Sequence, residues 1–294
     1  MADPPPDPLP DPRDLERLYD QANWAPNMQA VIARYRLISD AAGLAIGEPE
    51  RLSYGPADDE RLDLYRTAVQ SAPVVVFVHG GGWRDGTARQ YGFPAEMLVA
   101  AGVHFAALDF SSIDATKGDL AVPVAQIGRA LAWIGRNCAR FGGDPRRIYL
   151  VGHSSGAHLA AMALSTDRSD AEGPADPVRG ALLVSGIYDL GPLRHTSRIK
   201  HVRIDDGVER SLSPIHQIGH LATPLRLVVG SAESPEFQRQ THAYALAVAG
   251  SGKPATVVVG ETYHHFDILE TLGNPYGLLG RSLLDLVQAG NASA

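Results

Sequence analysis

A serine between two glycines stands where a buried strand meets a helix, and this junction constrains the fold most. Residues 148–151 form an apolar run typical of a strand that is covered on both faces, and the alanine-rich residues 155–164 predict a helix. The sequence Gly-His-Ser-Ser-Gly at 152–156 joins them. A serine on such a tight turn is held in a strained conformation that projects its hydroxyl above the sheet. The junction therefore predicts Ser154 as a nucleophile.

Strand and helix signals alternate along most of the chain. Strands are predicted at 51–54, 62–65, 74–78, 103–108, 148–151, 181–185, 225–229 and 256–259. Helices are predicted at 93–101, 122–140, 155–164, 236–249 and 276–289. Repeated strand–helix units form a mostly parallel sheet with helices around it. We therefore expect an α/β fold with an eight-stranded sheet.

The N-terminal region predicts a tail followed by a helical cap. The first twelve residues contain six prolines, which lack the amide proton that a helix or sheet interior needs. Residues 1–13 are therefore expected to be disordered, and residues 14–294 to form one domain. Apolar residues at helical spacing predict two short helices within 14–45, separated at Pro26, as a cap over the site.

Composition excludes several classes of protein. The chain has 26 Lys and Arg against 33 Asp and Glu, a net charge of −7, which argues against nucleic acid or anionic membranes as partners. The single cysteine, Cys138, excludes a disulfide framework and a thiolate metal cluster. No apolar run approaches the ~18 residues of a membrane span, and no signal peptide is recognised. We expect a cytoplasmic protein with a small-molecule substrate; the oligomeric state stays open, with a homodimer as one alternative.

A second motif, HGGGW at 79–83, directly follows the predicted strand 74–78. Consecutive glycines let a backbone approach a ligand closely and turn its amides inward. Such a loop supplies oxyanion donors beside a nucleophile turn, so we predict that the amides of Gly81, Gly82 and Ser155 form an oxyanion hole. A phosphate-binding loop is the alternative, but the lysine and Ser/Thr of a Walker motif are missing. His79 is expected to brace the loop by hydrogen bonding.

A serine nucleophile needs a base, and a carboxylate that orients the base. The base of an α/β-hydrolase follows the last strand on a loop, which here selects His264 or His265. The chain has eleven histidines, so most of them must be structural or exposed.

The carboxylate should follow the preceding strand, 225–229, where Glu233 and Glu236 are the candidates. Glu236 follows a proline and is expected to begin the next helix, so its replacement should be nearly silent. Glu233 is therefore favoured, with Asp189 and Asp267 as competitors.

Other residues have weaker signals. Trp83 and Tyr188 are expected to contact the substrate, and Trp24 either contacts it or packs in the core. His158 is expected to pack inside, and its spacing from His153 is wrong for two metal ligands on one helix face. We expect no metal and no cofactor.

The chain resembles the arylformamidase (kynurenine formamidase) branch of the α/β-hydrolases, close to the hormone-sensitive-lipase type of carboxylesterase. The shared segments are YDQANWAP, HGGGW, FGGDPRRIYLVGHSSGAHLAAMAL, SGIYDLGPL, GSAESPEFQRQT and HHFDILETLG. The resemblance implies Glu233 as the acid and His265, the histidine directly before Phe-Asp, as the base. Formamidases usually carry an aspartate as the acid, and their loop often has another residue after HGG, so this chain departs at both places.

Together these motifs predict a metal-free serine hydrolase that cleaves an ester or amide, of the aryl-formamide type. A general carboxylesterase for short-chain or aryl esters is the alternative substrate class, because it uses the same catalytic groups. A non-catalytic binding protein with a hydrolase fold is the alternative of another class. Such proteins typically lose the nucleophile or its base, whereas both are present here.

Overall fold

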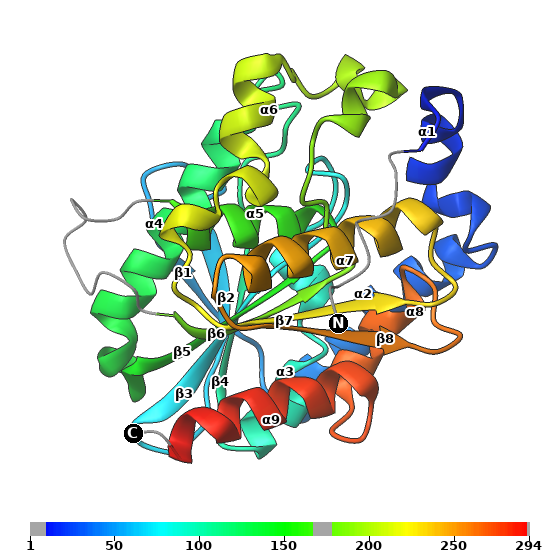
Figure 1. Ribbon diagram of the computed structural model, residues 1–294. Coiled ribbons are helices and arrows are strands. Elements are labelled where there is room, and N and C mark those ends of the chain that lie inside the picture. Colours follow the sequence, from blue (N-terminus) through cyan, green and yellow to red (C-terminus); the bar gives the residue numbers. More distant parts are fainter. Residues whose placement is uncertain (1–9, 167–177, 293–294) are drawn as a thin grey trace.

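A computed structural model describes residues 10–166 and 178–292, and its centre is an eight-stranded sheet (Figure 1). The strands are β1 (Glu50–Ser53), β2 (Arg61–Tyr65), β3 (Ala72–Val78), β4 (His104–Leu108), β5 (Gly143–His153), β6 (Val178–Val184), β7 (Leu225–Gly230) and β8 (Ala255–Gly260). Their order in the sheet is β1-β2-β4-β3-β5-β6-β7-β8. The predicted eight-stranded α/β architecture is confirmed.

Six of the eight strands pair in parallel, and this places the loops that form the site at one edge. β1 and β2 pair antiparallel, as do β2 and β4, whereas β3 pairs parallel with both β4 and β5, and β5 to β8 pair parallel in turn. The registers place Val78 beside Gly152 and His153 beside Val184. Since parallel strands end at the same edge, the loops after β3, β5, β6, β7 and β8 converge there.

Helices cover both faces of the sheet (Figure 1). One layer contains α4 (Ala121–Asn137), α5 (Ser155–Ser165) and α7 (Pro235–Gly250); the opposite layer contains α2 (Met28–Ile46), α3 (Ala95–Ala100), α8 (Asp267–Glu270) and α9 (Leu278–Ala292). In β3, Val76 packs in the first layer's core and Phe77 in the second's, which explains the continuous apolar run. No helix among the described residues has both the length and the hydropathy needed to cross a membrane.

The N-terminal cap consists of α1 (Pro12–Tyr19) and α2, separated by residues 20–27, which include Pro26 and the 3₁₀ turn Gln21–Asn23; α2, with 19 residues, is longer than the short helix expected. The helix α1 begins two residues before the expected Asp14, because Pro12 suits a first helical position and the side chain of Asp11 accepts a hydrogen bond from the amide of Arg13. Residues 1–9 of the expected tail lie outside the described residues.

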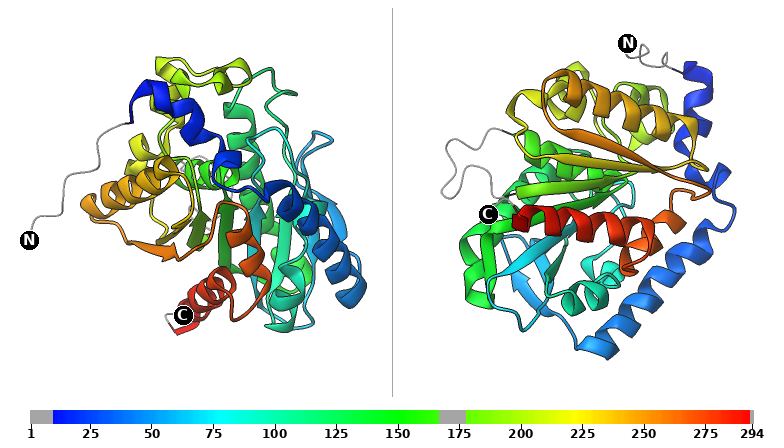
Figure 2. Two further views of the ribbon diagram at one scale, coloured as in Figure 1. Left: turned by 90° about the vertical axis from the view of Figure 1, so that its right-hand side faces the viewer. Right: turned by 60° about the horizontal axis from the view of Figure 1, so that its bottom comes forward.

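A second cap segment, residues 192–220, consists of short 3₁₀ turns and α6 (Asp206–Leu212), and the sequence analysis did not predict it. Its elements are too short to show a hydrophobic period. Figure 2 shows α1 beside this segment. The Glu16 carboxylate accepts hydrogen bonds from the amide and the hydroxyl of Ser197, both at 2.6 Å. The two cap segments therefore contact each other directly.

Candidate active site

Ser154 lies on the turn between β5 and α5 with φ 55° and ψ −124°. A positive φ is uncommon outside glycine and marks a strained position of the kind that strand-to-helix nucleophile turns use. The neighbouring glycine is required by packing: a Cβ on Gly156 would lie 2.2 Å from the carbonyl oxygen of Val78 and 2.3 Å from that of His79. The turn thus has the geometry that the glycine spacing predicts.

The structure brings together the three residues that the sequence selects from distant segments. His265 Nε2 lies 2.9 Å from Ser154 Oγ, and His265 Nδ1 lies 2.8 Å from Glu233 Oε2. The Glu233 and His265 side chains are almost fully buried, with 0% and 4% exposure. If Nδ1–H donates to the carboxylate, Nε2 is free to accept the serine proton.

Glu233 is oriented by further hydrogen bonds. Its Oε1 accepts from the amide of Gly230 at 2.7 Å and from the hydroxyl of Ser185 at 2.5 Å. Ser185 directly follows β6, with φ 52°. Sequence reasoning missed Ser185, whose only signal was its place at the end of a predicted strand.

The competing carboxylates have other partners. Glu236 starts α7, as expected, but it is buried, pairs with Arg239 at 2.7 Å and accepts from the Tyr19 hydroxyl at 2.9 Å. Asp267 accepts from the amide of His264 at 2.8 Å. Neither of these two carboxylates contacts the His265 ring.

The HGGGW loop after β3 borders Ser154. Gly81 has φ +110°, and its carbonyl accepts from the amides of Arg84 and Asp85, so the loop folds back on itself. A Cβ on Gly81 would lie 2.0 Å from the carbonyl oxygen of Asp85, and only glycine fits there. The amide of Trp83 donates to the hydroxyl of Ser155 at 3.1 Å and joins the loop to the start of α5.

His79 braces this loop in the way the sequence analysis expected. Its Nδ1 lies 2.8 Å from the carbonyl oxygen of Gly80, to which it donates. Its ring stacks with Tyr91 and Phe110, with centroids 5.3 and 4.5 Å away. Burial lowers the pKa of His79, which favours the neutral imidazole.

The loop that carries His265 is fixed on two sides. His153 Nε2 lies 2.8 Å from the carbonyl oxygen of His265, and burial lowers the pKa of His153 to about 3, so the neutral ring donates through Nε2. From the cap, the Tyr35 hydroxyl donates to the carbonyl of Phe266 at 2.6 Å. In the sequence, Tyr35 has no signal beyond its helical spacing.

Asn27 adds a second cap contact to the same loop. Its Oδ1 lies 2.7 Å from Nε2 of His264, whose Nδ1 accepts from the amide of Phe266 at 3.1 Å. His264, the alternative base, is therefore engaged on both ring nitrogens, and only His265 contacts Ser154.

A cavity of about 340 Å³ opens over Ser154 and His265. Its apolar wall comes from the N-terminal cap and the sheet edge and contains Met28, Ile32, Tyr35, Ile187, Phe237 and Phe266, and the second cap segment contributes Arg198. Its charged lining residues are Asp20, Arg84, Asp85 and Arg198.

The three residues expected to contact the substrate do not line this cavity, and this expectation is corrected. Trp83 is 1% exposed, because its indole turns inward and donates to His158 Nδ1 at 3.3 Å. Tyr188 is fully buried against Tyr244, with ring centroids 4.5 Å apart. Trp24 packs under the guanidinium of Arg17 instead.

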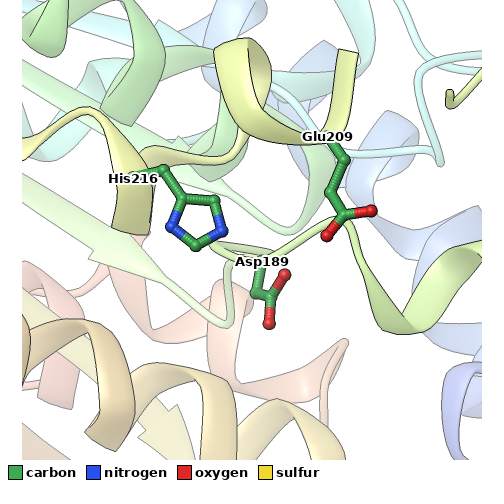
Figure 3. A group of neighbouring side chains, drawn as sticks. All are labelled: Asp189, Glu209 and His216. Atoms are coloured by element: carbon green, nitrogen blue, oxygen red, sulfur yellow. The ribbon is translucent and has the colours of Figure 1, made fainter. Parts of the chain in front are cut away.

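One group of side chains could offer metal ligands, away from the cavity lining. Asp189, Glu209 and His216 each present a ligand atom, and these atoms lie within 4.8 Å of one another (Figure 3). Glu209 already pairs with Arg194 at 2.6 Å, and Asp189 accepts from the amide of Gly191. A cation would have to compete with this arginine. Asp189, which the sequence offered as a competing acid, belongs to this group and not to the Ser154 site.

Comparison with known proteins places the chain in a family. The BD-FAE family model matches residues 62–189. The kynurenine formamidase of Danio rerio is 33% identical over 288 residues, which cover 93% of this chain and 96% of that protein. The chain belongs to the kynurenine formamidase family. It is therefore a hydrolase, as the sequence predicts.

Two further comparisons are with esterases. Esterase LipQ of Mycobacterium tuberculosis is 28% identical over 245 residues, which cover 75% of this chain and 58% of that protein. The crystal structure of esterase B from Lactobacillus rhamnosis superposes with a TM-score of 0.70 at 17% identity, covering 93% of this chain and 96% of that one. The second likeness shows a shared α/β-hydrolase fold.

Proposed function

We propose that this formamidase-family member hydrolyses N-formyl aromatic amines with Ser154 as nucleophile, His265 as base and Glu233 as the orienting acid. The observation that carries the proposal is the hydrogen-bonded series from Ser154 Oγ to His265 Nε2 and from His265 Nδ1 to Glu233, at 2.9 and 2.8 Å, on the floor of a cavity. Family membership supplies the choice of a formamide.

The proposed reaction has two halves. Ser154 Oγ attacks the formyl carbon while His265 Nε2 takes the serine proton. The C–N bond then breaks, His265 returns the proton to the leaving amine, and a formyl ester remains on Ser154. Water, deprotonated by His265, attacks this ester; the C–O bond to Ser154 breaks, formate leaves, and His265 returns the proton to Ser154 Oγ. The steps use protein groups and water alone.

The negative charge of the tetrahedral intermediate needs donors beside Ser154. The amides of Gly81, Gly82 and Ser155 are our candidates, because the first two line the cavity and the third begins α5, where the helix dipole favours an anion. Removing one such donor in comparable enzymes costs about 3 to 4 kcal/mol in the transition state.

The cavity wall supports an aromatic leaving group. Aromatic side chains on it come from the cap, at Tyr35, and from the sheet edge, at Phe237 and Phe266. Aromatic rings pack against each other favourably, and apolar walls suit aryl groups better than sugars or nucleotides. A cytoplasmic location is part of the proposal, in keeping with the one buried free cysteine, Cys138.

A general carboxylesterase is the second candidate function, favoured by the 28% identity to a protein named an esterase. The same nucleophile, base and oxyanion donors would serve an ester. The two functions differ in which substrate is turned over faster.

Turnover of purified enzyme on both substrate classes separates them. N-formylkynurenine should be hydrolysed with a higher kcat/KM than 4-nitrophenyl acetate or butyrate. Rapid turnover of the esters with the formamide untouched would overturn the formamidase proposal and leave the esterase.

A further inference from the structure

Arg198 lies on the second cap segment, in the 3₁₀ turn Ser197–Lys200, and lines the cavity above Ser154. One guanidinium nitrogen, Nη2, donates to the carbonyl of Tyr19 at 2.9 Å, so α1 holds this side chain in place. The other, Nη1, lies 3.3 Å from the position that a Cβ on Gly82 would occupy. The guanidinium is therefore held through Nη2, and its Nη1 lies beside the proposed oxyanion loop.

This cation has no carboxylate partner within the part of the chain that the structure describes. No ion pair joins it to an Asp or Glu there, and the charges of Asp20 and Glu16 act on it only at longer range. Arg84, which lines the same cavity, is instead paired with Asp114 at 2.9 Å. Burial lowers the pKa of Arg198, yet a guanidinium keeps its charge at any ordinary pH.

Arg198 is partly buried and faces the cavity, and a partly desolvated cation without a counter-ion is costly unless a ligand supplies the charge. Guanidinium groups bind carboxylates through paired hydrogen bonds of matching geometry. The cavity that contains Arg198 also contains Ser154, so one molecule can contact both.

We propose that Arg198 is the residue that binds a carboxylate on the leaving group of the substrate. The inference rests on the proposed function for the reaction itself. Arg198 is a specificity-determining residue in this account: it contacts the substrate away from the bond that breaks.

The test compares two formamides that differ only in the carboxylate. N-formylkynurenine has it, and N-formylkynuramine has a hydrogen in its place while keeping the amine and the ring. We expect wild type to prefer the first by about ten- to a hundredfold in kcat/KM, the effect of one hydrogen bond to a charged group. Arg198→Met should remove this preference, with most of the change in KM, and Arg198→Lys should keep part of it.

Arg84→Met is the matched control, because Arg84 lines the same cavity but is already neutralised by Asp114. Arg84→Met should change kcat/KM for the two substrates by the same factor. Thermal melting of each variant shows whether it is folded, and Arg198→Lys keeps the proposal testable if Arg198→Met does not fold.

A second measurement does not depend on formamide hydrolysis. Kynurenine should inhibit the hydrolysis of 4-nitrophenyl acetate more strongly than kynuramine, and Arg198→Met should abolish the difference. If wild type hydrolyses neither formamide but shows this difference, the proposed function fails and the carboxylate site stands. Equal inhibition by both compounds, unchanged in Arg198→Met, would overturn the carboxylate site.

Discussion

At the scale of single residues, the sequence predicts a site residue when that residue belongs to a motif or directly follows a predicted strand. Ser154 stands between glycines at a strand–helix junction, and His265 and Glu233 follow predicted strands, so their positions could be inferred. Ser185 and Arg198 could not, because each acts through one polar contact made by a turn with no recurring pattern.

The two glutamates near β7 should respond differently to mutation. Glu233→Gln should lower kcat by about 10³- to 10⁴-fold, because an amide favours the wrong tautomer of His265. Glu236→Ala should leave the kcat of the folded enzyme nearly unchanged but lower the free energy of unfolding by about 3 kcal/mol, because it leaves the partly buried Arg239 without its ion-pair partner. Urea denaturation and steady-state kinetics on both variants separate the effects.

This corrects the expectation that replacing Glu236 is nearly silent, since its side chain is 0% exposed. A larger loss of kcat in Glu236→Ala than in Glu233→Gln would contradict the assignment of the acid.

At the scale of elements, the N-terminal cap does more than line the cavity. The helix α2 and the segment before it hold the loop that carries His265, through Tyr35 and Asn27. The helices were predictable from apolar spacing. Their contacts with the His265 loop were not, because the hydroxyl of Tyr35 and the amide of Asn27 make them, and single polar groups have no recurring spacing in the sequence.

Removing one of these contacts should make the loop that carries His265 less well positioned without unfolding the protein. Tyr35→Phe deletes only the hydroxyl that donates to Phe266, so we expect kcat to fall several-fold and stability to fall by about 1 kcal/mol. Tyr276→Phe, at a tyrosine that is 88% exposed, is the matched control. Equal kcat in wild type, Tyr35→Phe and the control would show that this contact does not position the base.

At the scale of the whole molecule, the sheet could be predicted because its strands are short apolar runs separated by turns, and parallel pairing fixes where their ends meet. The second cap segment, 192–220, could not be predicted: its turns and short helix are held by contacts such as Glu16 to Ser197, between residues far apart in the chain. The prediction that Trp83 and Tyr188 contact the substrate was wrong for a related reason: both side chains turn into the core.

Two buried imidazoles should make stability depend on pH. Burial lowers the pKa of His153 to about 3 and that of His158 to about 4, whereas both would titrate near 6.5 in the unfolded chain. Between about pH 6.5 and 4 the unfolded state therefore binds more protons, and the free energy of unfolding falls as pH falls, by up to about 1.4 kcal/mol per pH unit for each ring.

Urea denaturation between about pH 7.5 and 5 measures this slope. The slope should be shallower in His158→Gln than in wild type. His242→Gln, which replaces an exposed histidine, is the control and should keep the slope of the wild type. Identical slopes in wild type and His158→Gln would contradict the account of the buried ring.

The most direct measurement is covalent labelling with a fluorophosphonate, which reacts with an activated serine. The intact native enzyme should gain one adduct, located by peptide mass spectrometry on Ser154. Ser154→Ala should keep the circular dichroism spectrum of the wild type and take up no label, and His265→Ala should label far more slowly. An adduct on another residue, or undiminished labelling of Ser154→Ala, would contradict Ser154 as the nucleophile.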